Sequence, residues 1–181
     1  MKFFLHPDLK QFKRSTAVIL PKDIGPIISI LTLSKDHEVV EIGGGSGFLS
    51  FYLARIVKKL YIYEKREDFY KNLIHNLKNF NNVEIRNEDG KNAKENAYAY
   101  IIDSSEFIDI LPNILEKSKW IVLYLPQIVQ ARDAALFLSK HSYKTWIVRS
   151  YLEEWDFDEK ILKPKNKQLT HTAFLVFGNK I

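Results

Sequence analysis

A glycine-rich stretch near position 45 constrains the fold more than any other part of the sequence. Residues 39–42 are apolar apart from Glu41, four glycines then occur within five positions, and an apolar-periodic segment begins at Phe48. This order predicts a strand, a tight turn and a helix, which form the ligand-binding corner of a doubly wound α/β sheet. Glycine suits such a turn because it accepts positive φ angles and lets a ligand approach the backbone.

The spacing of these glycines favours S-adenosylmethionine over a dinucleotide. Gly43, Gly45 and Gly47 form a G-x-G-x-G pattern, and Phe48 stands where a dinucleotide fingerprint needs its last glycine. S-adenosylmethionine has no pyrophosphate to seat on the following helix. Glu64 follows the next predicted strand, where a carboxylate would accept both ribose hydroxyls; the alternative is a turn that binds no ligand. The cofactor-binding residues predicted within the corner are Glu41, Gly43, Gly44, Gly45, Ser46 and Gly47.

Alternating strands and helices predict a single domain over residues 1–181, with an N-terminal arm and covering helix at 1–35 and a cofactor-binding core at 36–181. We predict strands at 38–42, 60–63, 83–86, 98–102, 119–125, 144–151 and 172–178, and helices at 47–58, 67–80, 106–117 and 127–141. The expected fold is α/β, a doubly wound, seven-stranded, mostly parallel and Rossmann-like sheet. Residues 88–97 leave room for at most a short crossover helix. The last two strands, joined by the charged loop 153–170, should form a C-terminal antiparallel hairpin at the sheet edge.

Composition excludes several kinds of protein. The chain has no cysteine, which excludes disulfides, thiolate chemistry and cysteine-ligated zinc, and its five histidines show no metal-ligand spacing. No apolar run approaches the roughly 20 residues that span a bilayer, and basic residues interrupt the N-terminal region before a signal-peptide core forms. We therefore expect a cytoplasmic protein with no membrane partner. The net charge of +5 permits a polyanionic partner without requiring one.

Two carboxylates follow central strands, where ligands bind in folds of this class. Asp89 follows the third strand and is predicted to accept a hydrogen bond from the adenine amino group of the cofactor; the alternative is a turn aspartate bonded to its own backbone. Asp103 follows the fourth strand, near the expected position of the transferable methyl group, and is the predicted catalytic residue. Its alternative role is to cap the helix that starts near Ser105 or Glu106.

Segments at both ends of the chain make it resemble a known family. Residues 13–25 (KRSTAVILPKDIG) and 171–177 (HTAFLVF) resemble the opening and closing motifs of tRNA (adenine-N1) methyltransferases, which modify adenine 58 in the T-loop. Residues 41–47 and 63–69 look like the cofactor motifs of that family. The resemblance extends over about residues 13–180 and implies S-adenosylmethionine as cofactor and tRNA as partner. It also implies substrate-binding roles for Arg14, Lys22, Pro126, Gln130 and His171.

The resemblance implies a reaction in which adenine N1 attacks the methyl group directly, while Asp103 holds the exocyclic amine and stabilises the developing positive charge. A target base buried in folded tRNA would have to flip out. The chain departs from the family on the substrate side. The Asp-Leu-Pro-x-Pro-Trp loop of the family is here Asp-Ser-Ser-Glu-Phe at 103–107, and Ala17 and Leu20 replace the usual Gln and Tyr.

Two alternatives to the tRNA reaction stay open. One is a single-domain, precorrin-type methyltransferase that acts on a small molecule, because the length of the chain and its leading helix resemble that group and the N-terminal β-rich domain of the tRNA enzymes is expected to be missing. The other is a non-catalytic subunit with the same fold that binds RNA within a methyltransferase complex, because the loop at 103–107 is altered. The resemblance also implies further copies of the chain, or a paralogous subunit, as partners.

Overall fold

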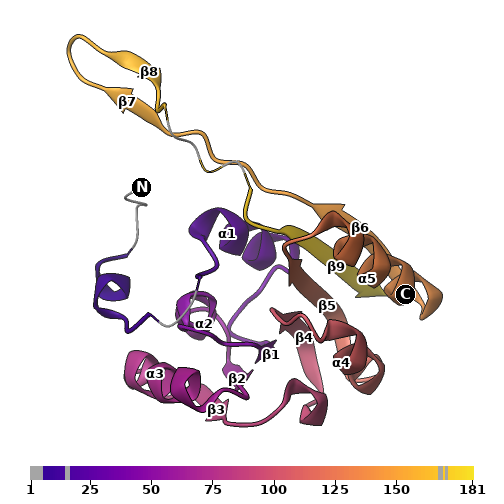
Figure 1. Ribbon diagram of the computed structural model, residues 1–181. Helices are drawn as coiled ribbons and strands as arrows, with labels where there is room; N and C mark the ends of the chain where they lie inside the picture. The colour runs from indigo at the N-terminus through magenta and orange to yellow at the C-terminus, as the bar shows by residue number, and fades with distance from the viewer. Residues whose placement is uncertain (1–5, 15–16, 167–168, 170) are drawn as a thin grey trace.

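The computed structural model describes residues 6–14, 17–166, 169 and 171–181. Its strands are β1 (Glu38–Ile42), β2 (Lys59–Tyr63), β3 (Val83–Arg86), β4 (Ala97–Ile102), β5 (Ser118–Leu125), β6 (Tyr143–Val148), β7 (Trp155–Phe157), β8 (Leu162–Pro164) and β9 (Phe174–Lys180). Its helices are α1 (Pro21–Ile30), α2 (Phe48–Ala54), α3 (Glu67–Leu77), α4 (Phe107–Ile114) and α5 (Ile128–Lys140), with 3₁₀ helices η1 (Pro7–Gln11) and η2 (Gly90–Asn92). Figure 1 shows the helices on both sides of a central sheet.

The central sheet has the strand order β3-β2-β1-β4-β5-β9-β6 in the described part of the chain. The first five strands in this order are parallel neighbours, and β9 runs antiparallel to both β5 and β6. This arrangement confirms the predicted seven-stranded, mostly parallel sheet and the antiparallel pairing of its last two strands. The chain passes from β1 outward to β3 and then returns to β4, so β1 and β4 meet at the switch point of the topology, where ligands bind in open α/β sheets.

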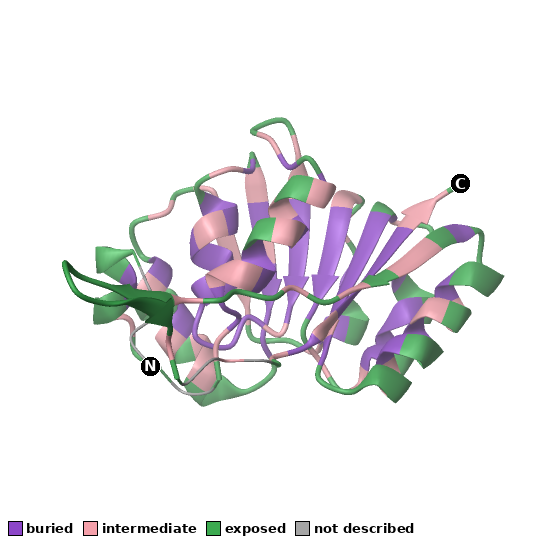
Figure 2. Ribbon diagram, turned by 90° about the horizontal axis from the view of Figure 1, so that it is seen from above, coloured by how far each residue is buried: buried purple, intermediate pink, exposed green. Residues whose placement is uncertain are grey.

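Side chains that alternate along the strands build a separate hydrophobic core on each face of the sheet. Val39 of β1 and Ile101 of β4 pack on the face covered by α1, α2 and α3. The neighbouring residues Val40 and Ile102 pack on the opposite face against α4 and α5. Figure 2 shows the buried strands between these two layers. Because helices cover both faces, the loops at the carboxyl ends of the strands are left as the ligand-binding edge.

Local contacts explain where the elements end. The predicted helix 47–58 ends early, at Ala54, where the side-chain amide of Asn82 donates to the carbonyls of Ala54 (2.8 Å) and Val57 (2.9 Å). These bonds satisfy carbonyls that the end of a helix leaves without partners. As predicted, the connection between β3 and β4 has no full crossover helix and contains only η2. No helix among the described residues combines the length and the apolar character needed to cross a lipid bilayer.

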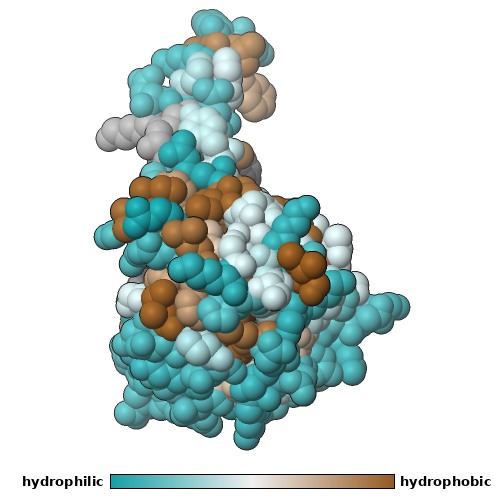
Figure 3. Space-filling model, turned by 90° about the vertical axis from the view of Figure 1, so that its right-hand side faces the viewer, coloured by the Kyte–Doolittle hydropathy of each residue, from teal (hydrophilic) through white to brown (hydrophobic). Residues whose placement is uncertain are grey.

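The prediction of an irregular charged loop at 153–170 is wrong in part, because β7 and β8 form a hairpin there. Figure 1 shows this hairpin projecting away from the sheet, and Figure 3 shows hydrophobic atoms on its surface. Phe157 is 83% exposed and Leu162 is 77% exposed. Both strands have only three residues and are exposed along their whole length, so they are too short for the four- to eight-residue alternating pattern that identifies a strand in sequence.

Candidate functional site

The turn after β1 is built from glycines that other residues could not replace. Gly43, Gly45 and Gly47 have φ angles of +87°, +55° and +79°. A Cβ atom on Gly43 would lie 2.1 Å from the carbonyl oxygen of Asp103, so the end of β4 can approach the turn only because this residue is glycine. The N–H of Asp103 donates to the carbonyl of Ile42 at 2.8 Å. The predicted corner therefore brings the predicted catalytic carboxylate beside the glycine turn.

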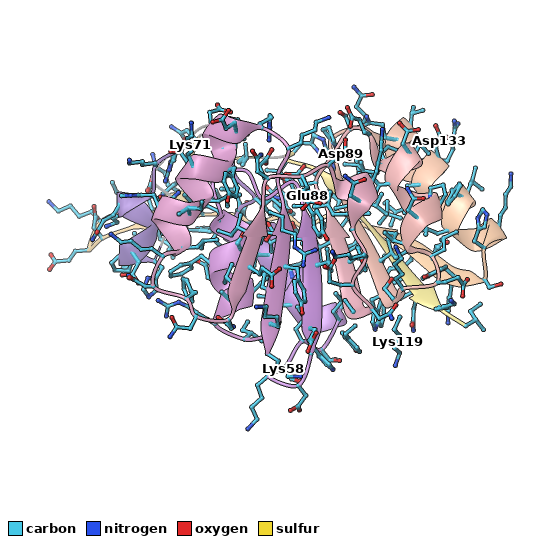
Figure 4. All side chains as sticks on the ribbon, turned by 90° about the horizontal axis from the view of Figure 1, so that it is seen from below. Lys58, Lys71, Glu88, Asp89, Lys119 and Asp133 are labelled. Carbon is cyan, nitrogen blue, oxygen red and sulfur yellow. The ribbon has the colours of Figure 1, made fainter. Side chains whose placement is uncertain are left out.

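Two adjoining cavities lie at the carboxyl ends of the central strands. The smaller, of about 170 Å³, is lined in part by Glu64 and Asp89, and we call it the Glu64 compartment. The larger, of about 390 Å³, is lined in part by Glu41 and Tyr124, and we call it the Tyr124 compartment. The residues that line both are Gly43, Arg66, Asp103, Ser104 and Ser105. In Figure 4 Asp89 lies at the opposite end of the sheet from Lys58 and Lys119.

The carboxylate of Glu64 is buried and fully hydrogen-bonded. Its Oε2 accepts from the N–H of Gly45 (3.1 Å) and from Nη2 of Arg66 (3.2 Å), and its Oε1 accepts from the N–H (3.1 Å) and Nε (2.9 Å) of Arg66. Burial opposes ionisation of Glu64, but these hydrogen bonds outweigh it and hold its pKa below the ordinary value. A carboxylate has about four lone-pair positions, so ribose hydroxyls can bind Glu64 only in place of Arg66 side-chain bonds.

Glu41, at the end of β1, is a buried carboxyl with unused bonding capacity. The residue is 2% exposed, and its Oε2 has no hydrogen-bond partner among the described residues. Burial raises its pKa to about 8; the nearby hydroxyl of Ser50 opposes this shift, and the charges of Asp103 and Glu64 add to it. At neutral pH this carboxyl is therefore mostly protonated. A cationic group in the Tyr124 compartment would give it the partner that the protein does not supply.

Asp103 stands on the wall between the two compartments, open to the cavities and crowded by protein on its other sides. This crowding raises its pKa to about 6, and the charge of Glu64 works in the same direction, whereas that of Arg66 opposes it. The alternative role as a helix cap is not observed, because Glu106 is the N-cap of α4 and the hydroxyl of Ser104 accepts the N–H of Glu106 at 3.2 Å. Asp103 is therefore not a helix cap, and the residue lines both compartments.

Asp89 both caps a turn and lines the Glu64 compartment. Its Oδ1 accepts the N–H of Lys91 at 2.9 Å at the start of η2, which is the alternative considered for a turn aspartate. The residue also lines the compartment together with Lys65 and Glu106, whose Nζ and Oε1 atoms lie 2.6 Å apart. This ion pair joins the loop after β2 to the start of α4. The adenine-binding role of Asp89 stays a prediction.

Three of the five predicted substrate-binding residues lie at the Tyr124 compartment or beside it. Pro126 and Gln130 line it, and Nε2 of His171 lies 2.9 Å from the carbonyl oxygen of Pro126. Oε1 of Gln130 is buried and has no hydrogen-bond partner among the described residues. These residues come from the end of β5, the start of α5 and the segment before β9. The Tyr124 compartment therefore combines unsatisfied polar atoms with an open volume.

The other two predicted substrate-binding residues, Arg14 and Lys22, line neither compartment. The guanidinium of Arg14 lies 4.9 Å from the centre of the Phe48 ring, at the start of α2. Nζ of Lys22 lies 2.7 Å from Oδ1 of Asp23, and the side chain of Lys22 is 5% exposed. Residues 15 and 16 of the family-like segment lie outside the described residues. Neither side chain meets the acceptor space in this structure, and their predicted contact with substrate stays a prediction.

Sequence reasoning did not predict three residues that line the cleft: Arg66, Tyr124 and Thr172. Tyr124 lies next to the end of β5, so its position at the carboxyl end of a central strand was a usable signal. Thr172 reaches the cleft because β9 runs antiparallel beside β5, and the sequence does not reveal that strand order. Arg66 follows Glu64 by two residues, but only the folded loop shows that its side chain donates hydrogen bonds to the carboxylate of Glu64.

The sequence and the fold both match known methyltransferases. Over residues 12–179 the sequence matches the family described as ribosomal RNA adenine dimethylase. The tRNA (adenine(58)-N(1))-methyltransferase TrmI of Thermus thermophilus is 30% identical, over 93% of this chain and 71% of the relative. The crystal structure of the tRNA methyltransferase TrmI from Aquifex aeolicus is 30% identical and gives a TM-score of 0.86, over 96% of this chain and 74% of that chain.

A second group of solved structures shares the fold at lower identity. The precorrin-6y C5,15-methyltransferase of Geobacter metallireducens is 18% identical with a TM-score of 0.78, and the match covers 96% of each chain. At this identity the likeness describes the arrangement of strands and helices alone. The relatives of both groups are methyltransferases, but they act on different kinds of acceptor.

Proposed function

The chain belongs to the ribosomal RNA adenine dimethylase family of S-adenosylmethionine-dependent methyltransferases, and from that premise we propose that it methylates N1 of an adenine in tRNA. The enzyme class and the cofactor follow from the family. The identity of the acceptor is the proposal. It rests on relatives that are 30% identical and named for this reaction, and on a carboxylate, Asp103, that faces the cleft beside the glycine turn.

The residues of the cleft fit the cofactor. When bound, S-adenosylmethionine supplies an electrophilic methyl group on a positively charged sulfur. We propose that Glu41 accepts hydrogen bonds from the amino group of its methionine part, because the buried Oε2 of Glu41 has no other partner among the described residues. Glu64 would take the ribose hydroxyls after Arg66 yields its bonds, and Asp89 would meet the adenine. The glycine turn leaves room for the cofactor beside its backbone.

Asp103 is proposed as the catalytic residue. N1 of adenine carries a free lone pair, so no base is needed to deprotonate it, but the methylated ring becomes cationic. A fixed carboxylate that accepts a hydrogen bond from the exocyclic amine favours this charge as it develops. The pKa of about 6 leaves Asp103 ionised at neutral pH, as this role requires. Pro126, Gln130 and His171 would contact the acceptor on the far side of the Tyr124 compartment.

A small-molecule acceptor is the second candidate, because the precorrin methyltransferase matched over 96% of both chains has the same fold with another kind of acceptor, so the fold alone does not select tRNA. A non-catalytic RNA-binding subunit is the third, suggested by the altered loop at 103–107. For the tRNA reaction we further propose a cytoplasmic location and assembly with further copies of the chain or with a paralogous subunit. The substrate-binding roles of Arg14 and Lys22 rest on the family resemblance alone, because no contact in the structure supports direct binding by either side chain.

The test is methyl transfer from labelled S-adenosylmethionine to unmodified bulk tRNA, followed by digestion and nucleoside analysis. The proposal predicts labelled N1-methyladenosine. A different labelled nucleoside would show that the chain is a methyltransferase that modifies another position in tRNA. Transfer to a precorrin substrate without transfer to tRNA would favour the second candidate. Binding of cofactor and tRNA without any transfer would favour the third.

A further inference from the structure

A buried ion pair lies behind the Tyr124 compartment, outside the lining of the cleft. Lys22 and Asp23, at the start of α1, place Nζ 2.7 Å from Oδ1, and their side chains are 5% and 0% exposed. Removing water from two charges is costly unless further hydrogen bonds satisfy them. Both charges therefore need partners nearby, and the partners come from distant parts of the chain.

These partners are two hydroxyls that lie about 150 and 128 positions from Lys22 in the sequence. The hydroxyl of Thr172 donates to Oδ2 of Asp23 at 2.7 Å and accepts from Nζ of Lys22 at 2.6 Å. The hydroxyl of Ser150 donates to Oδ1 of Asp23 and accepts from Nζ of Lys22 at 3.2 Å. Lys22 also donates to the carbonyl of Ser150 at 3.4 Å. One ion pair thus fixes the rotamers of both hydroxyls.

Ser150 and Thr172 stand at the two ends of the segment that leaves the sheet after β6 and returns before β9. This segment carries the β7–β8 hairpin, which projects away from the sheet in Figure 1. The start of α1 therefore holds together both ends of a long excursion of the chain. It does so at the point where the returning strand passes the cleft.

The same cluster reaches the acceptor space through side chains that line it. Thr172 and Tyr124 both line the Tyr124 compartment. The phenol of Tyr124 has a raised pKa, first because it is buried and second because the charge of Asp23 lies near it. His171, next to Thr172, lies 2.9 Å from the carbonyl of Pro126 on the same wall.

We propose that Lys22 and Asp23 are positioning residues, which hold Thr172, Tyr124 and the His171–Pro126 contact in the geometry that receives the methyl acceptor. The inference rests on the proposed function for the identity of that acceptor. In this proposal Lys22 does not bind the substrate directly but acts through Thr172. The ion pair is too deeply buried to meet a large substrate, but it sets the wall that the substrate meets.

The test compares Asp23→Asn, which removes the charge at constant shape, with Glu95→Gln as a matched control. Glu95 pairs with Arg86 on the β2–β3 side of the sheet, where the two side chains are 8% and 18% exposed. Asp23→Asn is expected to lower kcat/KM for the acceptor at least about tenfold, because small displacements in a site are costly. Its dissociation constant for S-adenosylmethionine should stay within about twofold of the wild type. Glu95→Gln should leave kcat/KM for the acceptor within about twofold of the wild type.

A second readout does not depend on any acceptor. In protein labelled with fluorotyrosine, the ¹⁹F resonance of Tyr124, assigned through Tyr124→Phe, should move in Asp23→Asn and stay in place in Glu95→Gln. If Asp23→Asn does not fold, Thr172→Val takes its place in the same spectrum, and Thr172→Ser should restore the wild-type position. An unmoved Tyr124 resonance, or equal loss of acceptor turnover in Asp23→Asn and Glu95→Gln, would overturn the positioning role. Failure of the wild type to methylate tRNA would instead remove the proposed function and leave the ¹⁹F test standing.

Discussion

The two compartments of the cleft differ in how far the protein satisfies its own polar groups. In the Glu64 compartment the carboxylate of Glu64 accepts four hydrogen bonds from Gly45 and Arg66. In the Tyr124 compartment, Oε2 of Glu41 and Oε1 of Gln130 are buried without hydrogen-bond partners among the described residues. Buried polar atoms are normally satisfied, so these two atoms are candidates to bond a ligand, as proposed above for Glu41 and the cofactor. In the Glu64 compartment a ligand must displace a protein contact instead.

The roles proposed for the lining residues divide the cleft between cofactor and acceptor. Glu64 and Asp89 lie on the side assigned to the ribose and adenine of the cofactor, and Gln130 lies on the side assigned to the acceptor. Asp103 lines both compartments and stands between them. Substitutions on the two sides should therefore have different effects, one kind on the affinity for S-adenosylmethionine and the other on the rate of methyl transfer.

Asp103→Asn tests the boundary between the compartments. The amide keeps the shape of the side chain but cannot stabilise the positive charge that develops on the acceptor ring. We expect the single-turnover rate of methyl transfer to fall about 10²- to 10³-fold, as for the loss of one preorganised electrostatic group. Rapid-quench measurement with saturating cofactor gives this rate. A rate within threefold of the wild type would remove Asp103 from the chemistry.

Glu64→Gln tests the cofactor side. The substitution removes the charge that the ribose hydroxyls would bond, and hydrogen bonds to charged groups contribute about 1.5–3 kcal/mol. We expect the dissociation constant for S-adenosylmethionine to rise about 10- to 100-fold, with the transfer rate at saturating cofactor much less affected. Calorimetric titration and single-turnover kinetics on the same protein separate the two effects. A normal dissociation constant would show that the ribose is held elsewhere.

The pH dependence of cofactor binding tests the unsatisfied carboxyl of Glu41. Its pKa of about 8 lies above the ordinary value, so the protein without cofactor holds a proton there at neutral pH. A cationic amino group binds the ionised form better, so affinity should fall as pH is lowered. Between pH 7.5 and 6.5 we expect a loss of about five- to tenfold in the wild type and a nearly flat profile in Glu41→Gln. A wild-type profile that is equally flat would argue against this contact.

Arg66→Ala removes the side chain that the ribose hydroxyls would have to displace from Glu64. It should therefore strengthen cofactor binding, whereas Glu64→Gln should weaken it. The guanidinium competes with the ribose hydroxyls for Glu64, but Arg66 is half exposed, so its pairing contributes little to stability. We expect affinity for S-adenosylmethionine to increase about two- to fivefold. Arg66→Lys keeps the positive charge but lacks the several N–H donors of a guanidinium, and it is the matched control. Its affinity for S-adenosylmethionine should lie between those of the wild type and Arg66→Ala. Weaker binding by Arg66→Ala would mean that Arg66 helps to form the site.

The sequence predicted the parts of the site that depend on local geometry. Gly43 and Gly47 mark a turn that needs positive φ angles, and Glu64 follows a strand whose end is legible from its apolar residues. Asp103 was predicted for the same reason, since a carboxylate after a central strand reaches the ligand-binding edge. The order of elements along the chain also predicted a mostly parallel sheet of seven strands, but it did not predict the order of the strands within that sheet.

The parts that were missed depend on contacts between distant segments. Thr172 lines the cleft because β9 inserts beside β5, and its bond to Lys22 joins residues 150 positions apart. The resemblance implied a substrate contact for Lys22, which stays a prediction; nothing in the sequence indicated the buried cluster that holds its ammonium. The β7–β8 hairpin escaped prediction because each of its strands has only three residues, too few for a recognisable periodic pattern. Strand order and buried polar clusters are properties of the folded chain.

Titration of S-adenosylmethionine into Asp103→Asn tests the separation of the two compartments most directly. The measurement is calorimetric, on the folded variant and the wild type side by side, with no acceptor present. The account predicts a dissociation constant within about threefold of the wild type in a variant that hardly transfers methyl groups. A dissociation constant more than about tenfold weaker would contradict it, because Asp103 would then belong to the cofactor side.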